Sequence, residues 1–140
     1  MRFAPLILTV ILFAHSVCAA ELKSSDDAVA LTDKAMQLFT SGDYREAVNL
    51  LRPYTTAQKT DLDSLVAQAE INMPIMIERY GKSLDYELLR NDTVGGSLIR
   101  VVYLQRLEKH AVVWRFILYH GSNGWVINNF IFADDITAAF

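Results

Sequence analysis

Two adjacent amides, Asn128 and Asn129, are the residues whose type and position most suggest a binding site. They lie in a predicted strand of alternating side chains, so one of the two must point into a face otherwise made of aromatic and aliphatic residues. A buried amide costs several kcal/mol unless its hydrogen bonds are satisfied. We expect either a structural partner, such as bulged backbone, a buried water or a helix end, or a polar group facing an apolar cavity.

The cavity interpretation brings in aromatic residues from other segments. A few polar groups among apolar walls are the usual composition of a small-molecule pocket. The hypothesis is therefore a pocket for a small apolar ligand, bordered by Tyr80, Tyr103, Trp114, Asn128 and Asn129.

The sequence contains no motif typical of catalysis or of metal binding. His110 and His120 stand at opposite ends of one predicted strand, about 30 Å apart, so they cannot share a metal ion or a proton. Cys18 is the only cysteine, and no cluster of histidines and carboxylates accompanies it. The sequence predicts no catalytic residue, no metal site and no cofactor.

The N-terminal segment has the order of an export signal. Arg2 is its only charge, residues 6–14 form a largely apolar core, and small residues follow where a signal peptidase would cut, after Ala19 or Ala20. The sequence predicts a cleaved signal peptide over residues 1–20 and a periplasmic or secreted protein.

Two alternatives to cleavage are an uncleaved anchor and a lipoprotein modified at Cys18. A membrane-spanning helix needs about 20 predominantly apolar residues, whereas this segment contains Pro5 and His15. A lipidation site would need an aliphatic residue and a small residue at the positions that His15 and Val17 occupy. The mature protein is therefore expected to have no thiol, no disulfide and no membrane contact.

Length and charge limit the partners. The chain carries 13 Lys and Arg against 16 Asp and Glu, a formal net charge of −3 at pH 7, without a block of like charge. Nucleic acids and anionic membranes both require a clustered basic surface, so neither is expected as a partner. About 120 residues would remain after cleavage, which suits one domain with a single core.

The predicted elements divide at Gly81 into a helical half and a stranded half. Residues 21–27 are polar and are expected to form a flexible lead-in to one domain over residues 28–140. Apolar spacing predicts helices over 28–39, 43–53 and 60–80. Asp43 and Glu46 suggest a capping box for the second helix, and Pro74 is expected to kink or end the third. The predicted buried stripe of this third helix is Leu62, Leu65, Val66, Ala69, Ile71 and Met73.

Alternating side chains predict four strands, over residues 84–89, 98–107, 111–119 and 125–132. The connections are short, so neighbouring strands should form antiparallel hairpins. Helices followed by a meander indicate an α+β fold, with N-terminal helices packed on a four-stranded antiparallel sheet.

Turn positions predict the register of the first two hairpins. A second hairpin centred at residues 108–109 places Tyr103 opposite Trp114 on the core face. A first hairpin centred at residues 93–94 places Glu87 opposite Arg100 on the outer face, in a ladder of cross-strand ion pairs.

The outer face of the sheet also carries four aliphatic residues, which is more than a freely solvated face would have. We expect a second copy of the sheet to cover it, giving a homodimer. The predicted interface residues are Val102, Leu104, Val113 and Ile117.

The order of elements resembles the nuclear-transport-factor-2-like superfamily, the cone-shaped fold of ketosteroid isomerase and scytalone dehydratase. The resemblance covers most of residues 26–140 and rests on that order and on the run from Val113 through Gly124 and Phe130 to Asp134-Asp135. It implies a strongly curved sheet forming a cone, and a catalytic Asp or His with Tyr acids inside the cone in the family's enzymes. The alternation of side chains between the two faces of the sheet places Asp85 and Glu87 outside the cone. Asp134 is expected to cap a short terminal turn.

Three function classes remain open. The favoured one is an exported binding or interaction domain without catalysis, holding a small apolar ligand in the cone. An isomerase, dehydratase or hydrolase using the cone interior would need Asp85, Glu87 or Asp134 in the cavity. A protein-only partner, such as an exported inhibitor or immunity-type protein, would have a filled cone and an exposed apolar sheet face.

Overall fold

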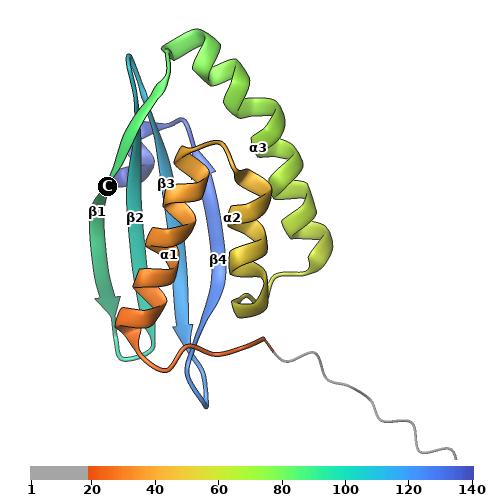
Figure 1. Cartoon of the computed structure of the whole chain (residues 1–140). Helices are drawn as coiled ribbons and strands as arrows, with labels where there is room; N and C mark the ends of the chain where they lie inside the picture. Colours follow the sequence, from red (N-terminus) through yellow and green to blue (C-terminus); the bar gives the residue numbers. More distant parts are fainter. Residues whose placement is uncertain (1–18) are drawn as a thin grey trace, which may run out of the picture.

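The computed structural model describes residues 19–140, so the predicted signal segment lies outside the described residues except for its last two. Three helices precede a four-stranded sheet, and Figure 1 shows α1 lying across one face of the sheet with α2 and α3 on the side of β4. The elements are α1 Ser25–Thr40, α2 Tyr44–Leu51, the 3₁₀ turn η1 Arg52–Tyr54, α3 Lys59–Tyr80, β1 Ser83–Val94, β2 Leu98–Leu107, β3 Ala111–His120, β4 Trp125–Ala133 and the 3₁₀ turn η2 Ile136–Ala139.

The sheet is an antiparallel meander in the order β1-β2-β3-β4. Tyr103 lies opposite Trp114 and Val101 opposite Phe116, which confirms the predicted register of the second hairpin. The predicted α+β fold, with N-terminal helices on a curved four-stranded antiparallel meander, is confirmed.

The first hairpin differs from the prediction because β1 continues to Val94 and turns later. Asp92 lies opposite Arg100 and accepts a hydrogen bond from its guanidinium at 2.7 Å, while Glu87 lies opposite Leu104. The predicted Glu87–Arg100 pair is therefore wrong. Asp92 takes the place of Glu87 as the carboxylate of that pair.

The start of α1 is stabilised by its own residues. The Ser24 hydroxyl accepts a hydrogen bond from the Asp27 amide at 3.0 Å, and Asp26 and Asp27 place negative charge in the first turn, where the helix dipole favours it. The helix therefore begins three residues before the predicted start at Ala28.

The segment before α1 is joined to the sheet. Leu22 exchanges two backbone hydrogen bonds with Trp125, at 2.9 and 2.7 Å. Gly124 permits this approach, because a Cβ atom built there would lie 2.5 Å from the Leu22 carbonyl oxygen. The division of the chain into lead-in and domain stays a prediction.

Two details of the second and third helices were predicted wrongly, namely the capping box at Asp43 and the burial of Ile71. Asp43 precedes α2 without a side-chain capping bond. Helix α3 continues through Pro74, which is exposed, so water can solvate the Glu70 carbonyl that the proline leaves without its helical donor. Ile71 is 64% exposed instead of lying on the buried stripe.

Aromatic side chains fill the space between α1 and the sheet. The Trp114 ring stacks on Phe39 with centroids 4.2 Å apart and lies 4.9 Å from Phe132. Tyr103 meets Phe116 edge to face, with centroids 6.0 Å apart. Trp114, Tyr103, Phe39 and Phe116 are among the largest fully buried side chains, so they occupy the interior of the predicted cone.

The outer face of the sheet is covered in part by the chain itself. Val102 and Val113 are buried in a small cluster with Ala139 of η2, and Leu104 and Ala138 pack against it. The chain therefore supplies, for these two valines, the cover that the sequence analysis assigned to a second copy. Within residues 19–140 no helix is both long and apolar enough to cross a membrane.

Candidate functional site

Tyr103 and Trp114 are members of the core. Both are buried, and each polar group has a partner: the Tyr103 hydroxyl lies 2.9 Å from Thr32 Oγ1, and Trp114 Nε1 donates to Gln105 Oε1 at 2.9 Å. Thr32 donates its own proton to the Val29 carbonyl at 2.7 Å, so Tyr103 must be the donor to Thr32. Burial raises the pKa of Tyr103 to about 12.

Both asparagines of the predicted pocket are exposed, so the expectation that one of them points inward is wrong. Ile117 pairs with Asn129, and Leu118 pairs with Ile127, which leaves Asn128 as an extra residue in a β-bulge. A bulge interrupts the alternation of side chains along a strand. The backbone irregularity therefore removes both amides from the interior.

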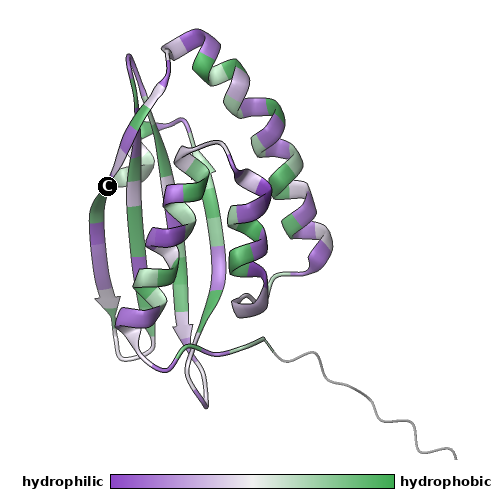
Figure 2. Cartoon of the chain, in the orientation of Figure 1, coloured by the Kyte–Doolittle hydropathy of each residue, from purple (hydrophilic) through white to green (hydrophobic). Residues whose placement is uncertain are grey.

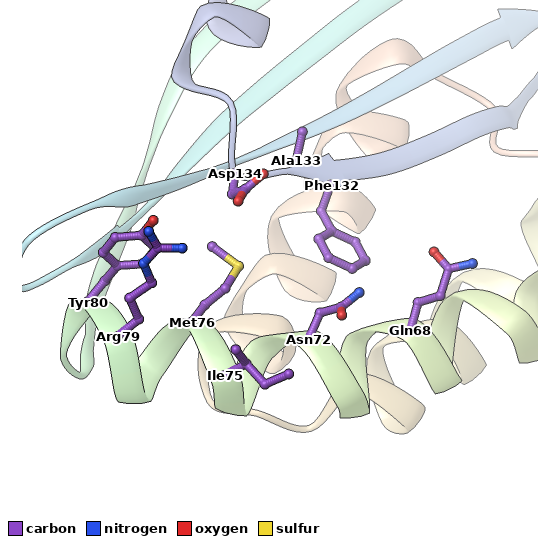
Figure 3. A pocket seen from close by; sticks show the side chains of 9 residues that line it. All are labelled: Gln68, Asn72, Ile75, Met76, Arg79, Tyr80, Phe132, Ala133 and Asp134. Carbon is purple, nitrogen blue, oxygen red and sulfur yellow. The ribbon is translucent and has the colours of Figure 1, made fainter.

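The cleft that combines charged, amide and apolar side chains lies between α3 and the end of β4 (Figure 3). We call it the α3–β4 cleft. Its volume is about 400 Å³, within the range of small-molecule sites. Tyr80 is the one residue of the predicted pocket that lines it. The lining residues are Gln68, Asn72, Ile75, Met76, Arg79, Tyr80, Phe132, Ala133 and Asp134.

Helix α3 forms one wall of the α3–β4 cleft. Gln68, Asn72, Ile75 and Arg79 are spaced by four, three and four residues, so they lie on one helix face over about 16 Å. Figure 2 shows hydrophilic positions recurring along the length of α3. The sequence already shows this spacing. It does not indicate a site, because the strand that forms the opposite wall is distant in sequence.

A chain of contacts joins the end of α3 to the end of β4. The Arg79 guanidinium lies 5.1 Å from the Tyr80 ring centroid, in a cation–π arrangement. The Tyr80 ring lies 4.4 Å from that of His110, and His110 donates from Nε2 to the Asp134 backbone carbonyl at 2.8 Å. These contacts bring Arg79 and Asp134 to the same end of the α3–β4 cleft.

The Asp134 side chain is left available to the cleft because its neighbour caps the terminal turn. Asp135 accepts hydrogen bonds from the Thr137 amide at 2.9 Å and from the Thr137 hydroxyl at 2.6 Å, and these bonds lower the pKa of the Asp135 carboxyl. The expectation that Asp134 is the cap is wrong by one residue. Asp134 instead projects toward α3 between Tyr80 and Phe132 (Figure 3).

The polar side chains of the α3–β4 cleft have no partners among residues 19–140. Within that range no hydrogen bond or salt bridge involves the side-chain polar atoms of Gln68, Asn72, Arg79, Tyr80 or Asp134. Five arginines elsewhere have carboxylate partners, in the pairs Arg45–Glu70, Arg52–Asp63, Arg90–Asp92, Arg100–Asp92 and Arg106–Asp85. The cleft therefore presents hydrogen-bonding capacity that the described chain does not use.

Two other clefts have different linings. One of about 730 Å³ lies beside Ala19 and Ala20, where the described chain begins, and its arginine, Arg52, is paired with Asp63. The other, of about 320 Å³, lies on the outer face between Leu89 and Phe140. None of the three clefts is lined by Tyr103, Trp114, Asn128 or Asn129.

The carboxylates considered for catalysis in the cone lie outside it. Asp85 pairs with Arg106 on the surface, and the hydrogen bond from Arg106 lowers the pKa of Asp85. Glu87 is exposed. Among residues 19–140 no three His, Cys, Asp or Glu side chains are grouped so as to hold a metal ion.

Comparisons with known proteins concern the fold. No protein-family model and no curated protein matches the chain. The chain is similar to a solved structure from Campylobacter jejuni described as an NTF2-like transpeptidase, with 13% identity and a TM-score of 0.48, over 76% of this chain and 99% of that one. The activity named in that description belongs to that protein.

The buried Thr32–Tyr103 pair makes a prediction about stability. Thr32→Val should leave the Tyr103 hydroxyl buried without a partner and lower the free energy of unfolding by about 1–3 kcal/mol. Tyr103→Phe removes that hydroxyl and leaves Thr32 bonded to Val29, so it should cost less. Chemical denaturation of both variants tests this, and a larger loss in Tyr103→Phe would contradict it.

A pH series serves as the control. The pKa of Tyr103 rises from 10.0 to about 12 on folding, so the folded state holds the phenol proton more tightly. The stability from this group should be complete below pH 10 and lost as the pH rises toward 12. Tyr103→Phe should show a smaller loss over that window than the wild type.

Proposed function

We propose that the protein is an exported binding domain without catalysis of its own, and that its ligand site is the α3–β4 cleft. The observation that carries this proposal is the set of polar side chains that line the cleft without partners among residues 19–140, beside the apolar Phe132, Ile75 and Met76. A ligand would replace the water that hydrates these side chains, and the apolar wall would provide contact area.

The filled interior favours the cleft over a ligand held inside the cone. Trp114 and Phe39 are both fully buried and stack directly across that interior. Protein interiors of this density leave few voids larger than a water molecule. The small apolar ligand of the sequence analysis would have to displace these side chains, whereas the α3–β4 cleft is already open.

Acid–base catalysis in the same cleft is the second candidate function. It is favoured by the position of Asp134, which lines the α3–β4 cleft together with Tyr80. The binding function is preferred because His110 donates its Nε2 proton to the Asp134 carbonyl, so this nitrogen is engaged by backbone and not by the carboxylate. A general base works best when a neighbour orients it and tunes its pKa.

The binding proposal predicts that blocking the cleft abolishes binding. Asn72→Trp places a large side chain on the wall of α3, whereas Ile71→Trp places it on the neighbouring position, which is exposed and outside the lining. The probes are phenylalanine, phenethylamine, 3-phenylpropionate and indole at millimolar concentration. Amide chemical shifts should change around Phe132 and Asn72 for at least one probe, in the wild type and in Ile71→Trp but not in Asn72→Trp.

If adding a probe still changes the amide chemical shifts of Asn72→Trp, the probe binds at a site other than the α3–β4 cleft. Absence of binding by all four probes would contradict the cleft as a small-molecule site. Thermal unfolding of both variants provides the control for folding, since both positions are exposed on α3.

Export with cleavage after Ala19 is the second part of the proposal. The Ala20 amide donates to the Pro53 carbonyl at 2.7 Å. A cut after Ala19 would retain this bond and make its donor a charged ammonium group, whereas a cut after Ala20 would remove it. The intact mass of the protein recovered from its native host should correspond to a chain beginning at Ala20.

Other masses would contradict the processing proposal. A chain that begins at Met1, or that carries a lipid on Cys18, would be incompatible with export and cleavage. A chain that begins at Glu21 would be incompatible with a cut after Ala19.

Self-association through the outer face is the third part of the proposal. Leu89, Ile136 and Phe140 are exposed there beside Leu104, and they line one shallow cleft. Burying such a patch against a second copy would remove apolar area from water. Light scattering at micromolar concentration should show a dimer that Leu104→Glu dissociates. Leu84→Glu, at an exposed position outside this lining, should leave the dimer intact, and a monomeric wild type would contradict the proposal.

A further inference from the structure

Two opposite charges stand at one end of the α3–β4 cleft. Arg79 and Asp134 both line it, and neither pairs with the other or with any other charged side chain of residues 19–140. A series of contacts connects the two residues. Arg79 lies over the Tyr80 ring, and His110 contacts that ring and bonds to the Asp134 backbone. The structure therefore holds a cationic group and an anionic group at the same end of the cleft.

The rest of the α3–β4 cleft is uncharged. Phe132, Met76 and Ile75 form an apolar middle section, and Asn72 and Gln68 continue the wall of α3 away from Arg79 (Figure 3). A ligand that fits this arrangement has both charges at one end and an uncharged body.

We propose that the α3–β4 cleft binds a free α-amino acid with an apolar side chain. The ligand carboxylate would meet the Arg79 guanidinium, the ligand ammonium would meet the Asp134 carboxylate, and the side chain would lie against Phe132 and Met76. This inference rests on the proposed binding function and deepens it by naming the class of ligand.

The chemistry of the two charged groups supports this class. A guanidinium offers a planar fork of donors that matches a carboxylate, and its stacking on Tyr80 restricts its orientation without using its N–H groups. The Asp134 carboxylate offers only acceptors, which suits an ammonium group. An α-amino acid carries both groups on a single carbon, so one ligand can neutralise both charges.

Ligands with one charge match the site less well. A carboxylic acid without an ammonium group would satisfy Arg79 and place its negative charge near Asp134. An amine without a carboxylate would satisfy Asp134 and approach Arg79. Both should bind more weakly than the amino acid, because like charges brought close together repel.

Calorimetric titration with three ligands of one shape tests the proposal. Phenylalanine has both charged groups, 3-phenylpropionate lacks the ammonium and phenethylamine lacks the carboxylate. Phenylalanine should bind the wild-type protein at least about tenfold more tightly than either analogue, since a charge-assisted hydrogen bond contributes enough to change affinity by that factor.

Two charge-neutralising variants assign each ligand group to its residue. Arg79→Gln should weaken phenylalanine binding by about tenfold or more and remove its advantage over phenethylamine. Asp134→Asn should remove the advantage over 3-phenylpropionate. Arg45→Gln is the matched control, because Arg45 is an exposed arginine paired with Glu70 outside the cleft, and its affinities should equal those of the wild type.

The outcomes separate this inference from the proposed function. If the three ligands bind the cleft with equal affinity, or if the single-charge analogues bind more tightly, the amino-acid assignment is overturned and the binding site stands. If phenylalanine binds selectively but Asn72→Trp and both charge variants leave it unchanged, the amino-acid site lies elsewhere and both proposals fail. Absence of binding by all three ligands and by indole also overturns both.

Discussion

The contact of Trp114 with Phe39 is the interaction on which the arrangement of the domain depends. Trp114 lies in β3, and its ring meets Phe39 of α1 on one side and Phe132 of β4 on the other. The indole nitrogen bonds to Gln105 of β2, whose amide in turn donates to Ser83 of β1. One side chain therefore links α1 to all four strands, both through apolar contact and through a satisfied polar network.

This filled centre determines where a ligand can bind. Stacked aromatic rings leave the cone without the open interior that a buried pocket requires. Of the three clefts described above, the α3–β4 cleft is the one where a helix with polar side chains faces the end of a strand. The packing that stabilises the domain thus excludes a ligand site inside the cone and favours a site in the α3–β4 cleft.

Charge pairing distinguishes the α3–β4 cleft from the paired arginines of β1 and β2. Arg100 and Arg106 of β2 meet carboxylates of β1 across the sheet, and these partners lower the pKa values of Asp92 and Asp85. Exposed pairs of this kind contribute little to stability, about 0–1 kcal/mol each. They nevertheless leave few charges on this face without a partner, whereas Arg79 and Asp134 remain available at the cleft. Two unpaired opposite charges beside an apolar wall are what a zwitterionic ligand could neutralise.

Local patterns in the sequence determined the order of elements and most of the core. Alternation along β2 and β3, together with the tight turn between them, was enough to predict that Tyr103 lies opposite Trp114. The late turn of the first hairpin was not predictable in this way, because β1 has irregular pairing at two points and these change which residues meet. The predicted register therefore gave Glu87 instead of Asp92 as the partner of Arg100, but this error did not change the predicted fold.

The candidate site was decided by tertiary structure. The bulge opposite Ile117 depends on the pairing of β4 with β3, and it placed Asn128 and Asn129 in solvent although the strand alternates in sequence. Gln68 to Tyr80 and Phe132 to Asp134 are separated by more than fifty residues, and each segment alone is an ordinary amphipathic helix or strand end. The sequence by itself determined which residues are apolar enough to form the core. Which polar residues converge on one cleft follows only from the packing of α3 beside β4, because side chains distant in sequence have no local pattern that records their proximity.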